Sequence, residues 1–231
     1  MALPKLEVPT FTTMLPSSKK SVKYRPFLVK EHKVLLMLSD ADAGEIQRVV
    51  TELIDACTFN KLDTNDLTYI DIVHMFIELR KASLGEQLPL VVNCPCGEAI
   101  NVTTNLNDVK TVINPEHSPK IRLSRAIVVE MSYPDFDQAL DMYKETDPDK
   151  FLEMAAGCVR GIHENNEFHD AKEYTRQEIQ EFLGDMSVSK MRELATFFET
   201  LPVIKLDVNT DCPKCARKHN LTVQNLDYFF V

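Results

Sequence analysis

The sequence contains no tryptophan, only six glycines, and no apolar run of the length that crosses a membrane. A transmembrane helix needs roughly 20 consecutive apolar residues. The N-terminal stretch also lacks the basic flank and apolar core of a signal peptide. These absences predict a protein that makes no direct membrane contact and stays in the cytoplasm where it is made.

The scarcity of glycine argues against nucleotide binding and the common hydrolase chemistries. Phosphate-binding loops need glycine so that the backbone can approach the ligand closely, and the GxGxxG, GxxxxGKS/T, GxSxG and HExxH motifs are all absent. The paired carboxylates Asp40 and Asp42 stand beside an expected helix start, where capping explains them. We predict that the protein is not an enzyme and binds no small-molecule substrate.

Positive charge is also in short supply, with 26 Lys and Arg against 35 Asp and Glu and a formal net charge of −9. Nucleic-acid-binding proteins gain affinity from clustered Lys and Arg, which displace counterions from the phosphates. The cluster here is Lys19, Lys20, Lys23 and Arg25, which we interpret as part of an exposed arm. The charge distribution therefore predicts no nucleic-acid partner.

The spacing of apolar residues predicts an α+β fold with five regions along the chain. Pro4, Pro9 and Pro16 favour extended backbone at the N-terminus. Helical spacing follows, and the apolar period changes to two around the cysteines. The regions are an extended N-terminal arm (1–26), a helical region (27–86), a first cysteine hairpin with following strands (87–132), a helical insert (133–201), and a second cysteine hairpin with an aromatic C-terminal tail (202–231).

Three helix starts carry capping signals. Asp42 is followed three residues later by Glu45, and Thr175 is followed at the same spacing by Glu178, as in a capping box. Ser187 precedes the apolar pattern of a further helix that ends before a Leu-Pro pair. We expect all three side chains to cap their helices.

Four of the six cysteines lie in two similar segments, NCPCGE and DCPKCA. Each segment follows one strand pattern and precedes another, which predicts a hairpin with cysteines at its tip. Cys57 and Cys158 instead stand alone on apolar stretches, where we expect them to pack in the core. Two tips with two thiolates each supply the four-sulfur set that zinc prefers. We therefore predict a zinc-ribbon-like element in which one structural Zn²⁺ ion is held by Cys94, Cys96, Cys212 and Cys215.

Several alternatives stay open for these cysteines. The gap in the first pair is one residue shorter than in the second, so His219 or His117 is a candidate to replace one thiolate. Two turns with incidental buried cysteines, a redox dithiol at Cys212 and Cys215, and a zinc ribbon that binds nucleic acid are the other interpretations. Four thiolates leave no open coordination position, so a zinc ion held by them is structural rather than catalytic.

The two ends of the chain are the candidate surfaces for contact with a partner protein. The N-terminal arm interleaves apolar and basic residues, and three aromatic residues at the C-terminus are costly to expose. The arm lies along this chain or a partner, and the tail either docks on this chain's own core or anchors a partner. The candidate partner-binding residues are Phe11, Leu15, Lys19, Lys20, Tyr24, Arg25, Tyr228, Phe229 and Phe230.

Five segments, in order along nearly the whole chain, match the pattern of one known family. They are the arm from Phe11 to Met37, the segment from Ile70 to Glu86, the CPCG turn, the FFETLP element from Phe197 to Pro202, and the CPKC turn followed by NLDYFF. Together they resemble the T-even-type baseplate hub assembly proteins of contractile-tailed phages. The resemblance implies assembly or structure of the tail baseplate hub through contacts with other phage baseplate, hub or tail proteins. The expected location is the host cytoplasm during assembly, and the resemblance leaves open whether the protein then stays in the virion tail baseplate or leaves.

Overall fold

The structure is a computed structural model that describes residues 6–40, 42–142 and 148–224. It combines helices with antiparallel sheets, so the predicted α+β class is confirmed. The helices are α1 (Val29–Leu35), α2 (Ala43–Cys57), α3 (Tyr69–Leu84), α4 (Phe136–Met142), α5 (Pro148–Gly157), α6 (Arg176–Gly184) and α7 (Val188–Glu199). The strands are β1 (Phe11–Met14), β2 (Ser21–Tyr24), β3 (Gln87–Asn93), β4 (Ala99–Asn105), β5 (Lys110–Val112), β6 (Lys120–Arg122), β7 (Ile127–Met131), β8 (Val159–Glu164), β9 (Glu167–Asp170), β10 (Val203–Asp211) and β11 (Lys218–Val223).

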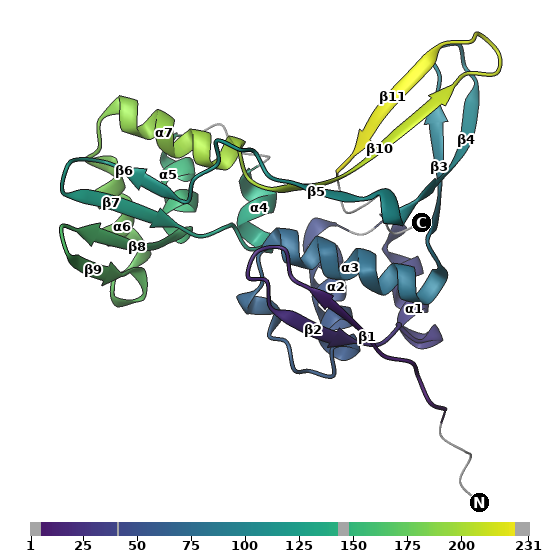
Figure 1. Cartoon of the computed structure of the whole chain (residues 1–231), viewed down its shortest axis with the longest axis horizontal. Coiled ribbons are helices and arrows are strands. Elements are labelled where there is room, and N and C mark those ends of the chain that lie inside the picture. The colour runs from purple at the N-terminus through teal and green to yellow at the C-terminus, as the bar shows by residue number, and fades with distance from the viewer. Residues whose placement is uncertain (1–5, 41, 143–147, 225–231) are drawn as a thin grey trace, which may run out of the picture. The chain divides into compact units, whose positions relative to one another are not determined.

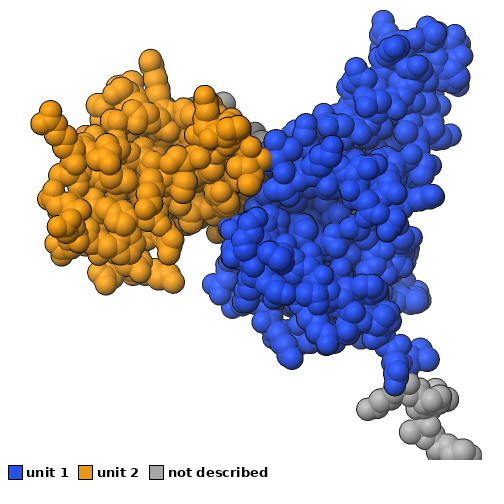
Figure 2. Space-filling view, viewed as in Figure 1, with its two compact units in different colours: residues 1–112, 203–231 blue, residues 113–202 orange. Residues whose placement is uncertain are grey.

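The chain divides into two compact units, coloured separately in Figure 2. Unit 1 joins Met1–Val112 to Val203–Val231, and unit 2 is Ile113–Pro202. Unit 2 is thus inserted between β5 and β10, which are hydrogen-bonded neighbours in unit 1. Among the described residues, no helix is long and apolar enough to span a bilayer.

The helical part of unit 1 is built around α3. Its side chains are buried on almost every face, with Ile72, Met75, Phe76 and Leu79 all nearly inaccessible to solvent. Helices that are apolar all round belong in the centre of a core. The amphipathic helix α2 packs beside it, and the Asp42 carboxylate accepts a hydrogen bond of 2.9 Å from the Glu45 amide, which confirms that predicted cap.

In the described part of the N-terminal arm, the chain folds into a two-stranded hairpin of β1 and β2. Figure 1 shows this hairpin beside α3. Polar contacts attach it to that helix. The Ser17 amide and hydroxyl both donate to the Asp71 carboxylate, and the Tyr24 hydroxyl donates to Glu78 at 3.2 Å. A buried carboxylate needs such donors, so the sequence of α3 fixes where the arm lies.

The hairpins β3–β4 and β10–β11 form a β element that we call the ribbon (residues 87–105 and 203–223). Alternate residues of each strand are buried, such as Leu88 and Val92 in β3 and Leu206 and Val208 in β10. The opposite faces carry mostly Asn, Thr and Asp side chains. Figure 1 shows the two hairpins side by side with their tips together. The alternation therefore buries one face of each hairpin and exposes the other.

Unit 2 is an antiparallel sheet of order β6-β7-β8-β9 covered on one face by helices. Its core joins Val129 and Met131 of the sheet to Leu183, Leu194 and Phe197 of the helices. The segment predicted as a helical insert is therefore helical only in part, because a strand pair crosses its middle.

Two local features differ from expectation. Ser187 stands at the N-cap position of α7 but makes no side-chain capping bond, since its hydroxyl pairs with the Ser189 hydroxyl at 2.9 Å instead. The prediction of a Ser187 cap was therefore wrong, whereas the capping box of Thr175 with Glu178 is present and confirmed. The three-residue strand β5 was not predicted, because its exposed KTV sequence has no apolar alternation.

Candidate metal centre

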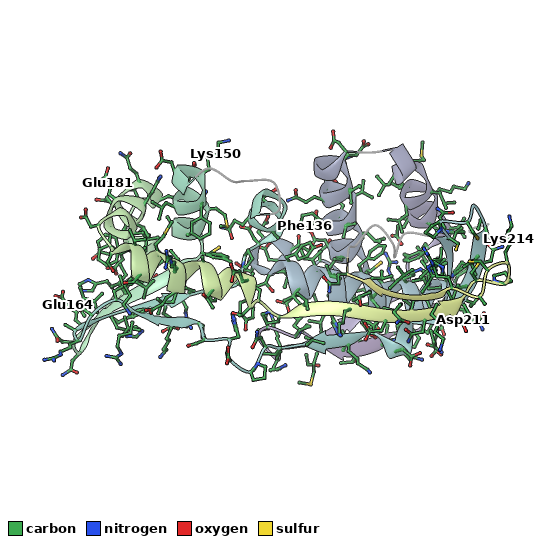
Figure 3. The ribbon with its side chains drawn as sticks, turned by 90° about the horizontal axis from the view of Figure 1, so that it is seen from above. Phe136, Lys150, Glu164, Glu181, Asp211 and Lys214 are labelled. Atoms are coloured by element: carbon green, nitrogen blue, oxygen red, sulfur yellow. The ribbon has the colours of Figure 1, made fainter. Side chains whose placement is uncertain are left out.

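The four cysteines of the two hairpins meet at the tip of the ribbon. Cys94 and Cys96 follow β3, whereas Cys212 and Cys215 follow β10, and the four sulfur atoms all lie within 4.8 Å of one another. The Sγ–Sγ distance is 3.6 Å from Cys94 to Cys215 and 3.6 Å from Cys96 to Cys212. Figure 3 labels Asp211 and Lys214 beside this tip. Each of these two pairs joins one hairpin to the other.

Each cysteine turn closes on the carbonyl of its first cysteine. The Gly97 amide donates to the Cys94 carbonyl at 2.9 Å, and the Ala216 amide donates to the Cys212 carbonyl at 2.9 Å. The second turn is one residue longer, and both closing residues have positive φ, 87° at Gly97 and 56° at Ala216. Glycine adopts this conformation freely, whereas alanine does so at a cost. The two turns therefore bring their sulfurs together despite the different gaps.

The spacing of the sulfurs fits a tetrahedral metal ion. A Zn–S bond of about 2.3 Å gives a sulfur–sulfur edge of about 3.8 Å in a regular tetrahedron. The Cys94–Cys215 and Cys96–Cys212 pairs, at 3.6 Å, lie slightly inside this edge, and all four sulfurs lie within 4.8 Å of one another. The four cysteines are close enough to bind one metal ion, and a small adjustment of the turns brings all four sulfurs to bonding distance.

Backbone amides at the tip point at the sulfurs. Burial raises the pKa of the Cys212 thiol, but donation from the Cys215 and Lys214 amides outweighs it and brings the pKa to about 7. At Cys96 the Glu98 amide lowers the pKa, yet the hydrogen bonds with Cys94 and the other sulfurs outweigh it and raise the pKa to about 12. Amide donors of this kind stabilise thiolate ligands, while crowding of four sulfurs opposes more than one negative charge unless a cation is present.

Apolar side chains of the ribbon strands pack against the buried side of the cysteine cluster. Val92 and Ile100 pack against Cys94 and Cys212, both of which are buried, whereas Cys96 and Cys215 are exposed. The centre is therefore held rigidly on its inner side and open to solvent on its outer side.

The other titratable candidates do not join this cluster among the residues described. His219 lies on β11 opposite Thr210 and is not part of the four-residue group. His117 belongs to unit 2, where its Nδ1 lies 3.0 Å from the Thr200 hydroxyl. Cys57 and Cys158 are each buried and apart, as predicted. The alternates His219 and His117 are therefore not needed to complete a four-ligand set.

The candidate partner-binding residues of the arm fall into two groups. Phe11, Lys19 and Lys20 are exposed. Leu15 and Tyr24 are instead only 1% and 4% exposed, so for these two residues the expectation of partner contact was wrong. They fill this chain's own core because β1 and β2 fold onto α3.

The remaining candidates are Arg25 and the aromatic tail. Arg25 forms a largely buried ion pair with Glu31 at 2.9 Å, which occupies its guanidinium. Tyr228, Phe229 and Phe230 lie outside the described residues. Of the nine candidates, three thus have side chains available to a partner in the part of the chain that the structure describes.

Two functional features escaped sequence reasoning. The amide donors to the sulfurs leave no trace in residue identity, although Gly97 directly after Cys96 was a usable signal for a tight turn. Asp71, which anchors the arm, is 2% exposed and was not among the predicted functional residues. The sequence feature that indicates this role is a carboxylate among apolar residues of a helix, because a buried carboxylate needs hydrogen-bond donors.

Comparison with known proteins gives one family match and one curated relative. Residues 8–231 match the family described as T4 bacteriophage base plate protein. The chain is also similar to the protein named "Baseplate hub assembly protein gp26" of Enterobacteria phage T4, with 25% identity over 217 residues that cover 91% of this chain and 93% of the relative. No solved structure matches the chain.

Proposed function

This chain belongs to the T4 bacteriophage base plate protein family, and from that membership we propose that it acts in assembling the hub of a tail baseplate. Family membership itself supports a structural or assembly role in the phage baseplate. The finer assignment to the hub rests on the name of the T4 relative, which spans nearly the same length. The observation that carries the proposal is the match over residues 8–231.

We propose further that the protein works through protein–protein contacts and not as an enzyme. The four sulfurs form a cluster in which every position of a tetrahedral ion would be occupied by protein. Catalytic zinc sites keep a position open for water or substrate. A centre of this kind stabilises the fold, and the surfaces that it supports carry the function.

The proposed metal is one structural Zn²⁺ ion held by Cys94, Cys96, Cys212 and Cys215. The ion would join two hairpins whose sequences are more than a hundred residues apart, and it would close the chain around the inserted unit 2. Zinc suits the site because thiolates are its preferred ligands and a tetrahedron its preferred geometry. The chain would fold and act in the host cytoplasm during assembly of the baseplate.

For partners we propose other phage baseplate, hub or tail proteins, with no nucleic acid, membrane or small molecule involved. The exposed side chains of Phe11, Lys19 and Lys20 support a contact at the arm. The aromatic tail is a second proposed contact, because its three aromatic residues favour burial against protein. Neither contact involves Leu15 or Tyr24, which are buried in the core of this chain.

Removal of the protein from an infecting phage tests the proposed function. We expect lysates of a phage with a nonsense mutation in this gene to contain filled heads and incomplete baseplates by electron microscopy, with tailed particles restored by the wild-type gene in trans. Normal tailed particles in the mutant lysate would contradict a role in baseplate assembly.

Mass spectrometry of purified wild-type particles separates the two forms of the proposal. Peptides of this chain in stoichiometric amounts identify a structural subunit of the hub. Their absence from particles that contain the other baseplate proteins identifies a protein that acts only during assembly.

A further inference from the structure

Helix α1 and the turn that follows it, Leu36–Asp40, present an unusual amount of exposed apolar surface. Val29 is 75% exposed, Leu36 62% and Met37 79%, all within nine residues of chain. Val34 adds a fourth apolar side chain at 45% exposure. Single exposed apolar residues are ordinary, but a contiguous group of this kind marks an interaction surface. We call this set, with Lys30 and Lys33 between its members, the α1 face.

The charge on the α1 face is entirely positive. Lys30 and Lys33 are exposed, and the sequence from 28 to 38 contains a single acid, Glu31. That acid is withdrawn from the surface, since it accepts two hydrogen bonds of 2.9 Å from the Arg25 guanidinium. A partner for this surface must therefore offer apolar contact together with negative charge.

Unit 2 of the same protein carries the required charge. Residues 113–202 contain 10 Lys and Arg against 18 Asp and Glu, whereas the rest of the chain contains 16 against 17. Nearly all of the net charge of −9 therefore resides in unit 2. Two copies of the chain have complementary surfaces without any other protein.

A groove on unit 2 has the shape and lining for the contact. It lies between α5 and α6, has a volume of about 640 Å³, and is lined by Leu152, Glu153, Arg176, Gln177, Gln180 and Glu181. Glu153 and Glu181 are exposed on its rim, and Figure 3 labels Glu181. Arg176 packs against the backbone at Gly157. The groove thus offers one apolar side chain, Leu152, and two carboxylates against one guanidinium, with one oxygen of Glu181 accepting a hydrogen bond of 3.0 Å from Gln177.

We propose that the α1 face of one copy docks into the α5–α6 groove of a second copy. Leu36 and Met37 would contact the groove at Leu152, with Lys30 and Lys33 facing Glu153 and Glu181. Two different surfaces meet in this contact, so it is heterologous, and repeated contacts produce a closed ring or an open filament rather than a two-fold dimer. The inference concerns self-association and does not rest on the proposed metal site or hub role.

Analytical ultracentrifugation of the full-length protein tests the contact over roughly 1 to 300 µM, a range that covers the weak affinities of small interfaces. We expect the average mass to rise with concentration at about 50 mM NaCl. It should fall again at about 500 mM NaCl, because the Debye length shortens from about 14 Å to about 4 Å. A protein that stays monomeric throughout at low salt overturns the proposal.

Charge reversal identifies the surfaces. Lys30→Glu with Lys33→Glu in one protein, or Glu153→Lys with Glu181→Lys in another, should each weaken association at least about tenfold. A matched control, Lys61→Glu with Lys110→Glu, changes two exposed lysines elsewhere in unit 1 by the same charge and should associate like wild type. Equal weakening by the control and the α1 variant contradicts docking through α1.

Mixing the two reversed proteins provides the decisive measurement. In the mixture the reversed α1 face meets the reversed groove, and the wild-type α1 face meets the wild-type groove, so association should return to wild-type strength. Circular dichroism of each variant establishes that the helices remain folded. Two folded variants that stay monomeric when mixed overturn the assignment of these surfaces.

Discussion

The ribbon of unit 1 and the core of unit 2 hold distant segments together by different means. In unit 2, strands and helices share a continuous apolar core that includes Val129, Leu183, Leu194 and Phe197. At the tip of the ribbon, the buried cluster consists of Val92, Ile100 and two cysteines, with Val102 packed against it. The free energy gained from apolar burial is proportional to the buried area, so burial stabilises the tip of the ribbon much less than it stabilises unit 2. A region with a small core needs a crosslink, and the sulfur cluster supplies the ligands for one.

The largest effect should follow from removing ligands of the metal. Cys212→Ser with Cys215→Ser takes two of four thiolates, and because metal binding is coupled to folding, we expect zinc content to fall from one ion per chain to almost none. Hydrogen exchange should then accelerate in β3, β4, β10 and β11 but not in α7. Elemental analysis and exchange mass spectrometry measure both quantities.

Cys57→Ala is the matched control, since it removes a buried cysteine outside the cluster. Its zinc content should equal that of the wild type even if its melting temperature falls. Full zinc occupancy in the Cys212 and Cys215 double variant would contradict the proposed site.

The second prediction concerns the apolar core of unit 2, which is weakened while the cysteine cluster of unit 1 is left unchanged. Phe197 is 2% exposed and its ring centroid lies 5.0 Å from that of Phe198. Phe197→Ala should cost about 3–5 kcal/mol of unfolding free energy through lost burial and a cavity. Zinc content should not change, because the sulfur cluster belongs to unit 1. Denaturant unfolding and metal analysis of the same samples check this.

Val188→Ala serves as the control for Phe197. Val188 is 73% exposed on the same helix, so its truncation should change stability by less than about 0.5 kcal/mol. Loss of zinc from Phe197→Ala would show that the two regions are not independent.

The third prediction concerns the polar attachment of the arm, which resembles the ribbon in relying on a few specific contacts. Asp71 accepts hydrogen bonds from the Ser17 amide at 3.0 Å and the Thr68 hydroxyl at 2.7 Å, and also from the Ser17 hydroxyl. Asp71→Ala leaves these donors unsatisfied and should cost about 3 kcal/mol. Faster hydrogen exchange in β1 and β2 would report release of the arm, and the exposed Asp66→Ala should have little effect.

The fourth prediction uses pH to compare a largely buried ion pair of unit 1 with an exposed ion pair of the same unit. Burial raises the pKa of Glu31, but the hydrogen bonds from Arg25 and the Leu28 amide outweigh it and set the pKa below its ordinary value of 4.5. A carboxyl with a lowered pKa contributes stability above its unfolded pKa, and that stability is lost as pH falls through the folded value.

Glu31→Gln should therefore cost about 1–2 kcal/mol near pH 7. The difference from wild type should shrink as pH falls below about 4.5. Urea unfolding at a series of pH values measures it. Glu52→Gln, at an exposed pair with Arg48, should behave like wild type across the range. A constant difference at all pH values would mean that Glu31 contributes by packing alone.

Sequence reasoning succeeded where the signal is local or chemically strong. The caps at Asp42 and Thr175 and the two cysteine hairpins all follow from residue type and spacing. The CPCG and CPKC turns also predicted which cysteines would meet, because few arrangements of four thiols satisfy both hairpins.

It failed where a long-range contact decides the outcome. Leu15 and Tyr24 read as parts of an exposed arm because their burial depends on α3, more than forty residues away. Strand β5 exists only because β10 lies beside it, with Lys110 paired to Lys205. Local patterns carry no information on such pairings, and tertiary contacts override the weak propensity of a three-residue strand.

The smallest predicted effect separates two helix starts within unit 2 that look alike in sequence. The Thr175 hydroxyl accepts a hydrogen bond from the Glu178 amide at 3.2 Å, and the Thr175 amide donates to the Glu178 carboxylate at 2.7 Å. Thr175→Ala should therefore cost about 1 kcal/mol, as the loss of an N-cap usually does. Ser187→Ala removes no capping bond and should cost less than about 0.5 kcal/mol. Thermal unfolding of both variants resolves the difference, and equal losses would mean that Ser187 caps its helix in solution.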